Sequence, residues 1–226
     1  MSKGRLLAII TILIQLCTIT VYAKEPKDDN PNFLRKRNYY YYRFTEKWVF
    51  NVGLGGQVFS GENDSEKGIV ERLKPAFSIS ANKQINEYFA FRGKLSGGQH
   101  LNTNLYYDID FSSVGVSADG MLNVSRLISD IIPPESPRFW LFGGLGIEKS
   151  NETIKHKANG FSESTYPMFN AGLYAEIPFN NRMNFTAELR GSVVGERFDG
   201  EIGGIAYEGF GTLLFGVTYY FKKKDQ

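Results

Sequence analysis

Apolar and polar residues alternate along most of this chain with a period of two, which is the spacing of a β-strand with one apolar face. Eight segments show the pattern: residues 48–58, 73–82, 89–96, 114–125, 139–148, 169–179, 183–190 and 212–221. Each is close to the length of a strand that crosses a bilayer at a tilt, ~9–11 residues. Only the N-terminus approaches the ~20 apolar residues of a membrane-spanning helix, so the pattern predicts β-strands.

The connections between these strands alternate in length. Residues 83–87 and 180–182 are short, whereas 60–68, 98–110, 149–166 and 195–208 are longer and polar. Short periplasmic turns and long outer loops are typical of outer-membrane barrels, in which an even number of strands closes the sheet without a free edge. We therefore predict an all-β fold, an eight-stranded antiparallel up-and-down transmembrane β-barrel over residues 48–226. The connection 126–138 is long for a periplasmic turn and has room for one helical turn.

The charged side chains indicate which face of the barrel is inside. Alternation also fits a soluble barrel with an apolar interior, but here the charges share a face with Gly, Ser and Asn, which suit the narrow interior of eight strands. Six charged residues are expected to meet there and close the lumen: Arg92, Lys94, Asp119, Glu176, Glu188 and Arg190. A gated ion path through Arg92, Lys94, Glu188 and Arg190 is the alternative, and so narrow a bore favours static pairing.

Aromatic residues recur near the ends of the apolar faces, where amphipathic rings favour the membrane interface. The expected interfacial aromatics at the periplasmic end are Trp48, Phe89, Phe139, Phe179 and Phe185, with Tyr219 and Phe221 beside them. Towards the exterior the candidates are Phe111, Phe169 and Phe210. Two such girdles indicate a barrel that is integral to the outer membrane of a Gram-negative cell.

The first residues are typical of a secretory signal peptide. Lys3 and Arg5 precede an apolar segment, residues 6–16, and we expect cleavage after Ala23. An uncleaved anchor is the alternative, but the apolar segment is shorter than a spanning helix. The sequence thus divides into a signal peptide, residues 1–23, a polar, poorly ordered periplasmic segment, residues 24–47, and the barrel, residues 48–226.

Removal of the signal changes both charge and cysteine content. Cys17 is the only cysteine of the chain, so the mature protein has no thiol and no disulfide. Subtracting Lys3 and Arg5 from 26 basic residues leaves 24, which balance the 24 acidic residues. A mature chain without net charge does not point to a nucleic-acid partner.

The final strand resembles the C-terminal signal that the barrel assembly machinery recognises, with Gly216, Tyr219 and Phe221 at the characteristic spacing. The polar residue usual two positions before the glycine is Leu214 here, so the match is partial. Residues 78–83, 88–93, 118–125 and 198–204 resemble, in this order, the N-terminal barrel of OmpA-like outer-membrane proteins. The resemblance covers residues 46–224 and implies outer-membrane lipid, lipopolysaccharide and the assembly machinery as partners. The resemblance is to that barrel only, so we expect no peptidoglycan-binding domain of the kind that full OmpA proteins contain.

The sequence contains no motif typical of catalysis, metal binding or cofactor binding. The two histidines of the mature chain, His100 and His156, both fall in expected loops, and no HExxH, CxxC or GxSxG occurs. No helix follows the glycine clusters at 53–56 and 143–146, so they are not phosphate-binding loops. We therefore expect no cofactor, no metal site and no enzyme activity.

The function expected from these observations is structural or surface-interacting, with the loops exposed outside the cell and available to an extracellular ligand. A narrow, low-conductance pore is the first alternative. A lipid A-modifying enzyme is the second, and His156 with Ser162, Glu163 or Ser164 is the only constellation that could serve it.

Overall fold

The computed structural model describes residues 48–60, 68, 70–103, 108–128, 136–151, 165–180, 182–195 and 207–221. The expected signal peptide and the segment 24–47 lie outside these residues. Eight strands form: β1 (Trp48–Ser60), β2 (Lys74–Gln84), β3 (Phe89–Thr103), β4 (Asp108–Asn123), β5 (Arg138–Asn151), β6 (Thr165–Pro178), β7 (Met183–Gly195) and β8 (Tyr207–Tyr220). One short helix, α3 (Val124–Ile128), follows β4.

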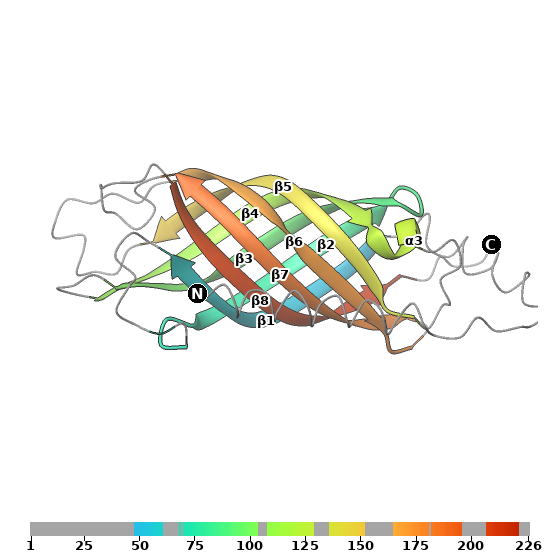
Figure 1. Ribbon diagram of the computed structural model, residues 1–226, viewed down its shortest axis with the longest axis horizontal. Coiled ribbons are helices and arrows are strands. Elements are labelled where there is room, and N and C mark those ends of the chain that lie inside the picture. The colour runs from blue at the N-terminus through green and yellow to red at the C-terminus, as the bar shows by residue number, and fades with distance from the viewer. Residues whose placement is uncertain are drawn as a thin grey trace, which may run out of the picture. The chain divides into compact units, whose positions relative to one another are not determined.

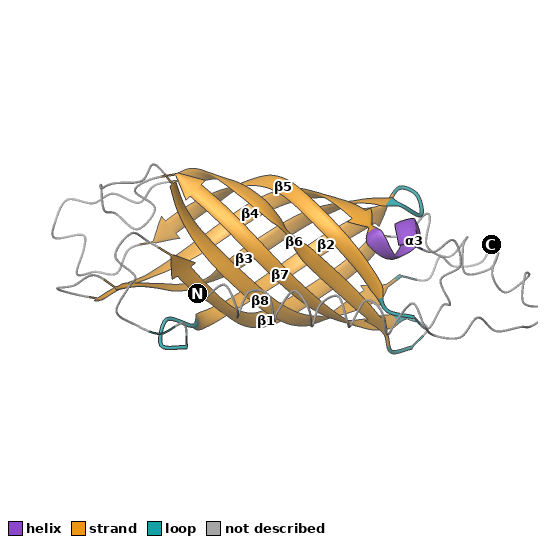
Figure 2. Ribbon diagram, viewed as in Figure 1, coloured by secondary structure: helices purple, strands orange, loops and turns teal. Residues whose placement is uncertain are grey.

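Every strand pairs antiparallel with its neighbour in sequence, and β8 pairs back onto β1, which closes the barrel (Figure 1). The closing seam runs from the pair Val49–Tyr220 to the pair Ser60–Gly209. Figure 2 shows that strands account for nearly all of the described structure. The prediction of an eight-stranded antiparallel barrel is therefore confirmed.

Among the described residues, no helix has the length and apolar character needed to cross a membrane.

The barrel has two unlike ends. At one end, the turn end, short connections join β2 to β3 and β6 to β7, and each is held by an asparagine side chain. Asn86 Oδ1 accepts hydrogen bonds from the amides of Tyr88 and Phe89, and Asn180 Oδ1 accepts from those of Arg182 and Met183. Such side-chain bonds to the following backbone stabilise tight turns. At the other end, the loop end, the connections from β1 to β2, from β5 to β6 and from β7 to β8 are longer, as the sequence predicts.

The turn-end connection from β4 to β5 contains the helical turn that its length predicts, although this turn begins earlier than expected. Asn123 ends β4 and accepts a hydrogen bond from the Arg126 amide at 3.1 Å, as a helix N-cap does. The Arg126 guanidinium also pairs with Glu87 of the first turn at 2.5 Å. Val124, expected on the apolar face of a strand, therefore lies in α3.

One expected loop is wrong. Residues 98–110 are polar and were expected to leave the sheet, but β3 continues to Thr103 and β4 begins at Asp108. These two strands, of 15 and 16 residues, are longer than the ~9–11 that a bilayer requires. The outward residues of these extensions, such as Gln99 and Ser112, are polar. They lie beyond the lipid-facing belt, the band of exposed apolar residues to which Leu95 and Val114 belong.

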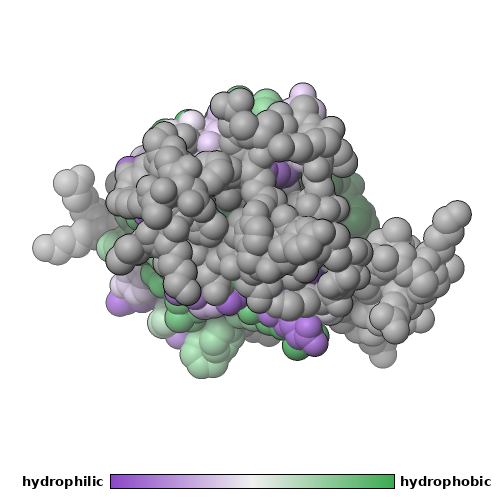
Figure 3. All heavy atoms as spheres, turned by 90° about the vertical axis from the view of Figure 1, so that its left-hand side faces the viewer, coloured by the Kyte–Doolittle hydropathy of each residue, from purple (hydrophilic) through white to green (hydrophobic). Residues whose placement is uncertain are grey.

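The outward faces of the strands are apolar and the inward faces are mostly polar. Leu54 and Phe91 are 66% and 62% exposed, whereas Arg92 and Asp119 are 2% and 0% exposed. In Figure 3, which views the loop end, both green apolar atoms and purple polar atoms are visible around the edge that grey atoms leave uncovered. This distribution is the reverse of a water-soluble barrel and suits a wall surrounded by lipid.

Two apolar clusters inside the barrel were not expected. Nearest the loop end lie Phe59, Phe111, Met168, Val194 and Phe210; nearer the turn end lie Ala90, Met121, Trp140, Phe142 and Tyr174. The placement of Phe111 and Phe210 in an outer aromatic girdle is therefore wrong. Phe111 has the same parity along β4 as the inward Asp119, so it points into the lumen. Phe169 does face outward.

Candidate functional site

The lumen at mid-barrel is occupied by paired charges. Arg92 on β3 and Asp119 on β4 are direct cross-strand neighbours, and the guanidinium donates to Asp119 Oδ2 from Nε at 2.9 Å and from Nη2 at 2.7 Å. Arg190 reaches the same oxygen from β7 across the lumen at 2.5 Å. One carboxylate oxygen thus accepts three charge-assisted hydrogen bonds, the strong class of such bonds.

Glu188 on β7 joins the remaining cations. Its Oε1 accepts from Lys94 Nζ at 2.6 Å and from Arg190 Nε at 2.8 Å, and its Oε2 accepts from Arg92 Nη1 at 2.9 Å. Each arginine therefore binds both carboxylates, as the planar guanidinium fork allows. The pairs link β3 to β7 across the bore, so the charges connect opposite walls of the barrel.

Aromatic rings lie next to the guanidinium groups of the two arginines. The guanidinium carbon of Arg92 lies 4.4 Å from the centre of the Phe142 ring and 5.4 Å from that of Tyr174. Arg190 lies 4.8 Å from the centre of the Phe142 ring. These distances are within the range of cation–π attraction. The rings fix the arginines and fill space that water would otherwise occupy.

Five of the six expected lumen charges are thus joined by ion pairs, while Glu176 has a different neighbourhood. It is buried inside the barrel, and its Oε2 accepts a hydrogen bond from the Tyr220 hydroxyl at 3.0 Å. Tyr220 in turn accepts from Asn184 Nδ2 at 2.9 Å. Glu176 therefore belongs to a polar group nearer the turn end.

A second polar chain lies closer to the loop end. Ser113 Oγ donates to Glu148 Oε1 at 2.6 Å and lies 2.7 Å from His100 Nε2. The expectation of a loop position for His100 is wrong, because β3 extends far enough to hold it inside the barrel, where it is 1% exposed. The ring needs a hydrogen-bond partner at that burial, and Ser113 supplies one.

Between the two polar groups lies a cavity of about 10 Å³, lined by Gln57, Lys94, Glu148, Asn170, Arg190 and Ser192 among others. This volume is close to the smallest that holds a water molecule. Glycine shapes the interior elsewhere: a Cβ atom on Gly144 would overlap the Asp119 carboxylate. The described interior is therefore packed with side chains, and the described residues contain no group of three potential metal ligands.

The expected interfacial aromatics lie on the outward face at the turn end. Trp48, Phe89, Phe179 and Phe185 are exposed, and Phe139 is half-buried beside α3, which packs against β5. Phe179 and Phe185 contact each other with ring centres 4.9 Å apart. Tyr219 and Phe221 of the expected assembly signal are 5.0 Å apart on the same surface. Recognition of that signal stays a prediction.

Comparison with known proteins gives no match in sequence: neither a protein-family profile nor a curated protein matches the chain. Among solved structures, Neisserial surface protein A aligns at a TM-score of 0.54 and 14% identity, over 77% of this chain and 97% of its own. The N-terminal β-barrel domain of Pseudomonas aeruginosa OprF aligns at 0.48 and 14%, over 78% and 98%. Ail of Yersinia pestis aligns at 0.42 and 16%, over 78% and 99%.

The likeness to Neisserial surface protein A concerns the fold, which the closed antiparallel topology already shows. The apolar belt on the outside and the paired charges inside are the features that a lipid-embedded barrel requires. The chain is therefore an integral membrane β-barrel with the fold of the small eight-stranded outer-membrane proteins.

Proposed function

We propose that this protein is a closed, non-catalytic barrel of the outer membrane with a structural or surface-interaction role. The observation that carries the proposal is the lumen itself, which Arg92, Asp119, Glu188 and Arg190 cross from wall to wall. A lumen filled in this way has no path for a solute. The lipid-facing wall and the loops are therefore the parts of the protein that can interact with other molecules.

The orientation follows the rule for such barrels, with short turns in the periplasm and long loops outside. The belt contacts outer-membrane lipid and, in the outer leaflet, lipopolysaccharide. The barrel assembly machinery is the partner during insertion, and an extracellular ligand would bind through the loops. The interior is unsuited to nucleic acid, since its cations already bind carboxylates.

A pore is a less favoured function for a barrel with this interior. Ions would have to displace pairs in which each arginine binds two carboxylates. Removal of one partner of a buried ion pair destabilises a protein by about 3–5 kcal/mol, because the other charge is left buried without a partner. Separation of the pairs without a replacement partner leaves charges unpaired in the same way. Thermal opening of the whole network would therefore be rare, and this supports a closed barrel.

An enzyme is also less favoured. The described interior brings His100, Ser113 and Glu148 together, but the serine hydroxyl lies between the histidine and the glutamate. In a hydrolase the histidine lies between serine and carboxylate, so that it can remove the serine proton. The group is also buried, out of reach of a lipid substrate. The alternative set around His156 lies outside the described residues.

Conductance of the full chain in a planar bilayer tests the closed barrel. We expect no steady current from preparations whose heat-dependent gel migration shows that they are folded. A large, steady current that scales with the amount of folded protein would overturn the proposal.

Surface labelling of intact cells tests the orientation. Because the mature chain has no cysteine by our prediction, a cysteine can be introduced at one chosen position. Ser162→Cys, in the connection between β5 and β6, should react with a membrane-impermeant maleimide on intact cells, whereas Asn180→Cys, in a turn, should react only after lysis. The opposite pattern would show that the loops face the periplasm.

A further inference from the structure

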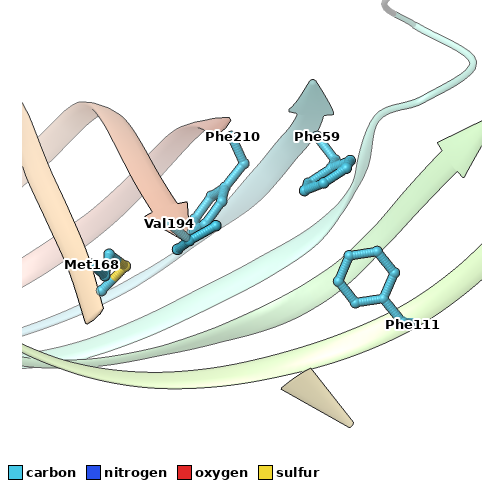
Figure 4. Packing of buried hydrophobic residues seen from close by; sticks show 5 residues of the cluster. All are labelled: Phe59, Phe111, Met168, Val194 and Phe210. Carbon is cyan, nitrogen blue, oxygen red and sulfur yellow. The ribbon is translucent and has the colours of Figure 1, made fainter. Parts of the chain in front are cut away.

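Six buried side chains surround the lumen axis at the loop end, and we define them as the apolar layer: Phe59, His100, Phe111, Met168, Val194 and Phe210. They come from β1, β3, β4, β6, β7 and β8, so they surround most of the bore. Figure 4 shows the five apolar members pointing inward from their strands. All six are at least nine-tenths buried.

His100 is the centre of this layer. Its ring stacks on Phe111, with centres 4.8 Å apart and planes 16° from parallel. Phe210 and Phe59 meet it edge-on, with centres 5.0 Å and 5.8 Å away. Phe59 and Phe111 also touch each other at 5.5 Å. These are contact distances of packed aromatic rings, so the centre of the bore is occupied.

The histidine adds little polarity to this packing. Its Nε2 is bound to Ser113, and Gln57 Nε2 lies 3.1 Å from the same nitrogen. Phe111 is stacked on the ring, and Phe59 and Phe210 contact it edge-on. The layer is therefore apolar towards the bore and fixed to the wall by hydrogen bonds at its edge.

The layer is separate from the charge network. His100 is eight residues beyond Arg92 on β3, and Phe111 is eight residues from Asp119 on β4. At a rise of ~3.3 Å per residue and a strand tilt of ~35–45°, this separation is roughly 20 Å along the barrel axis on these two strands. On β7 the two levels are closer, because Val194 is four residues beyond Arg190, which corresponds to roughly 10 Å. The water-sized cavity lies between the two levels.

We propose that the apolar layer is a second barrier in the lumen, in series with the charge network, so that either level alone keeps the barrel closed. The inference rests on the proposed closed barrel and goes beyond it by locating an independent seal. The physical basis is that an ion passing an apolar constriction loses its water without gaining a partner. A charge network, in contrast, can exchange partners with an entering ion.

Conductance of matched variants tests this proposal. The layer variant combines Phe111→Ala with Phe210→Ala, which removes two rings that contact His100. The network variant combines Arg92→Ala with Glu188→Ala, which removes one charge of each sign. A further variant, the fourfold variant, carries all four of these substitutions. The control combines Phe169→Ala with Phe215→Ala. It also removes two phenylalanine rings, but these rings face outward, towards lipid.

We expect the unmodified protein, both double variants and the control to remain closed. The fourfold variant should show current at least tenfold above that background. Current through the network variant alone would overturn the inference but leave the closed unmodified barrel intact. A folded fourfold variant that stays closed would overturn it too. Current through the unmodified protein would contradict the proposed function itself, that of a closed barrel.

Thiol reactivity provides a second test that needs a smaller change. Ser192→Cys places a thiol at the cavity, on the turn-end side of the layer. A small charged methanethiosulfonate added to the loop end should react at least tenfold more slowly with this thiol than after the further change Phe111→Ala. Equal, rapid reaction with the layer intact would show that water and ions already pass it.

Discussion

Arg92 and Asp119 face each other on β3 and β4, and two nitrogens of the guanidinium donate to a single carboxylate oxygen, at 2.9 and 2.7 Å. Arg190 adds a third bond to that oxygen from the opposite wall. Asp119 is therefore the point at which local pairing between neighbouring strands is joined to pairing across the lumen.

Asp119→Asn should be strongly destabilising, because it removes one of the two carboxylates that bind the buried Arg92 and Arg190. Loss of one partner of a buried ion pair lowers the free energy of unfolding by about 3–5 kcal/mol. Urea unfolding in lipid vesicles, followed by tryptophan fluorescence, measures this change. Glu87→Gln is the control, since it removes an ion pair with Arg126 that is partly exposed and should change stability by about 1 kcal/mol or less.

Leu189→Arg should block folding, whereas Ser112→Arg should not. Leu189 faces outward within the lipid-facing belt, where an arginine destabilises the barrel by about 2–4 kcal/mol. Ser112 also faces outward, but it lies towards the loop end of β4, beyond the belt. The folded fraction in vesicles, read from heat-dependent gel migration, measures both. Equal folding of the two variants would contradict the position of the belt.

The two tryptophans should report opposite sides of the barrel wall. Trp48 is 54% exposed on the outer face, and Trp140 is 5% exposed inside. In the Trp140→Phe variant, lipids brominated near the headgroup should quench the remaining fluorescence strongly. In Trp48→Phe they should quench it weakly, and aqueous acrylamide should also have little effect. Strong lipid quenching of Trp140 would mean that β5 is inverted.

Gly216→Val should destabilise the closing seam, whereas Gly211→Val on the same strand should be tolerated. A Cβ atom on Gly216 would overlap the Val52 carbonyl oxygen and come within 3.0 Å of Gly53 Cα on β1. Overpacking of this kind reduces stability by about 1–3 kcal/mol. At Gly211 nothing lies within 4 Å of the added atom. Urea midpoints of the two variants compare them directly, and equal midpoints would rule out a tight seam.

Spontaneous folding separates this packing role from recognition by the assembly machinery. Tyr219→Ala should fold into vesicles nearly as well as the unmodified protein, because Tyr219 lies on the outer surface. If the expected signal is read in the cell, the same variant should accumulate poorly in the outer membrane. Normal accumulation would remove Tyr219 from that signal.

The sequence determined the number of strands and which face of each strand points inward. It also determined that the interior of the barrel is polar and charged. Because the side chains of a strand alternate between two faces, one charged residue such as Asp119 assigns the whole of β4 to inside and outside. The same parity places Phe111 in the lumen, but only if the strand is extended before residue 114, where the expected strand begins. The polar stretch around His100 concealed the continuation of β3, since strands that pass the bilayer lose the apolar face that identifies them.

Only the tertiary structure decided which inward charges meet. Arg92 and Glu188 are 96 residues apart in sequence and lie on strands that are not neighbours in the sheet, so no local pattern relates them. Their contact depends on how far each strand is staggered when the barrel closes, and on side chains long enough to span the bore. The same closure brings Glu176 to Tyr220 and assembles the apolar layer from six strands. A period of two specifies the face of a residue, whereas its height and its partner across the lumen are properties of the closed sheet.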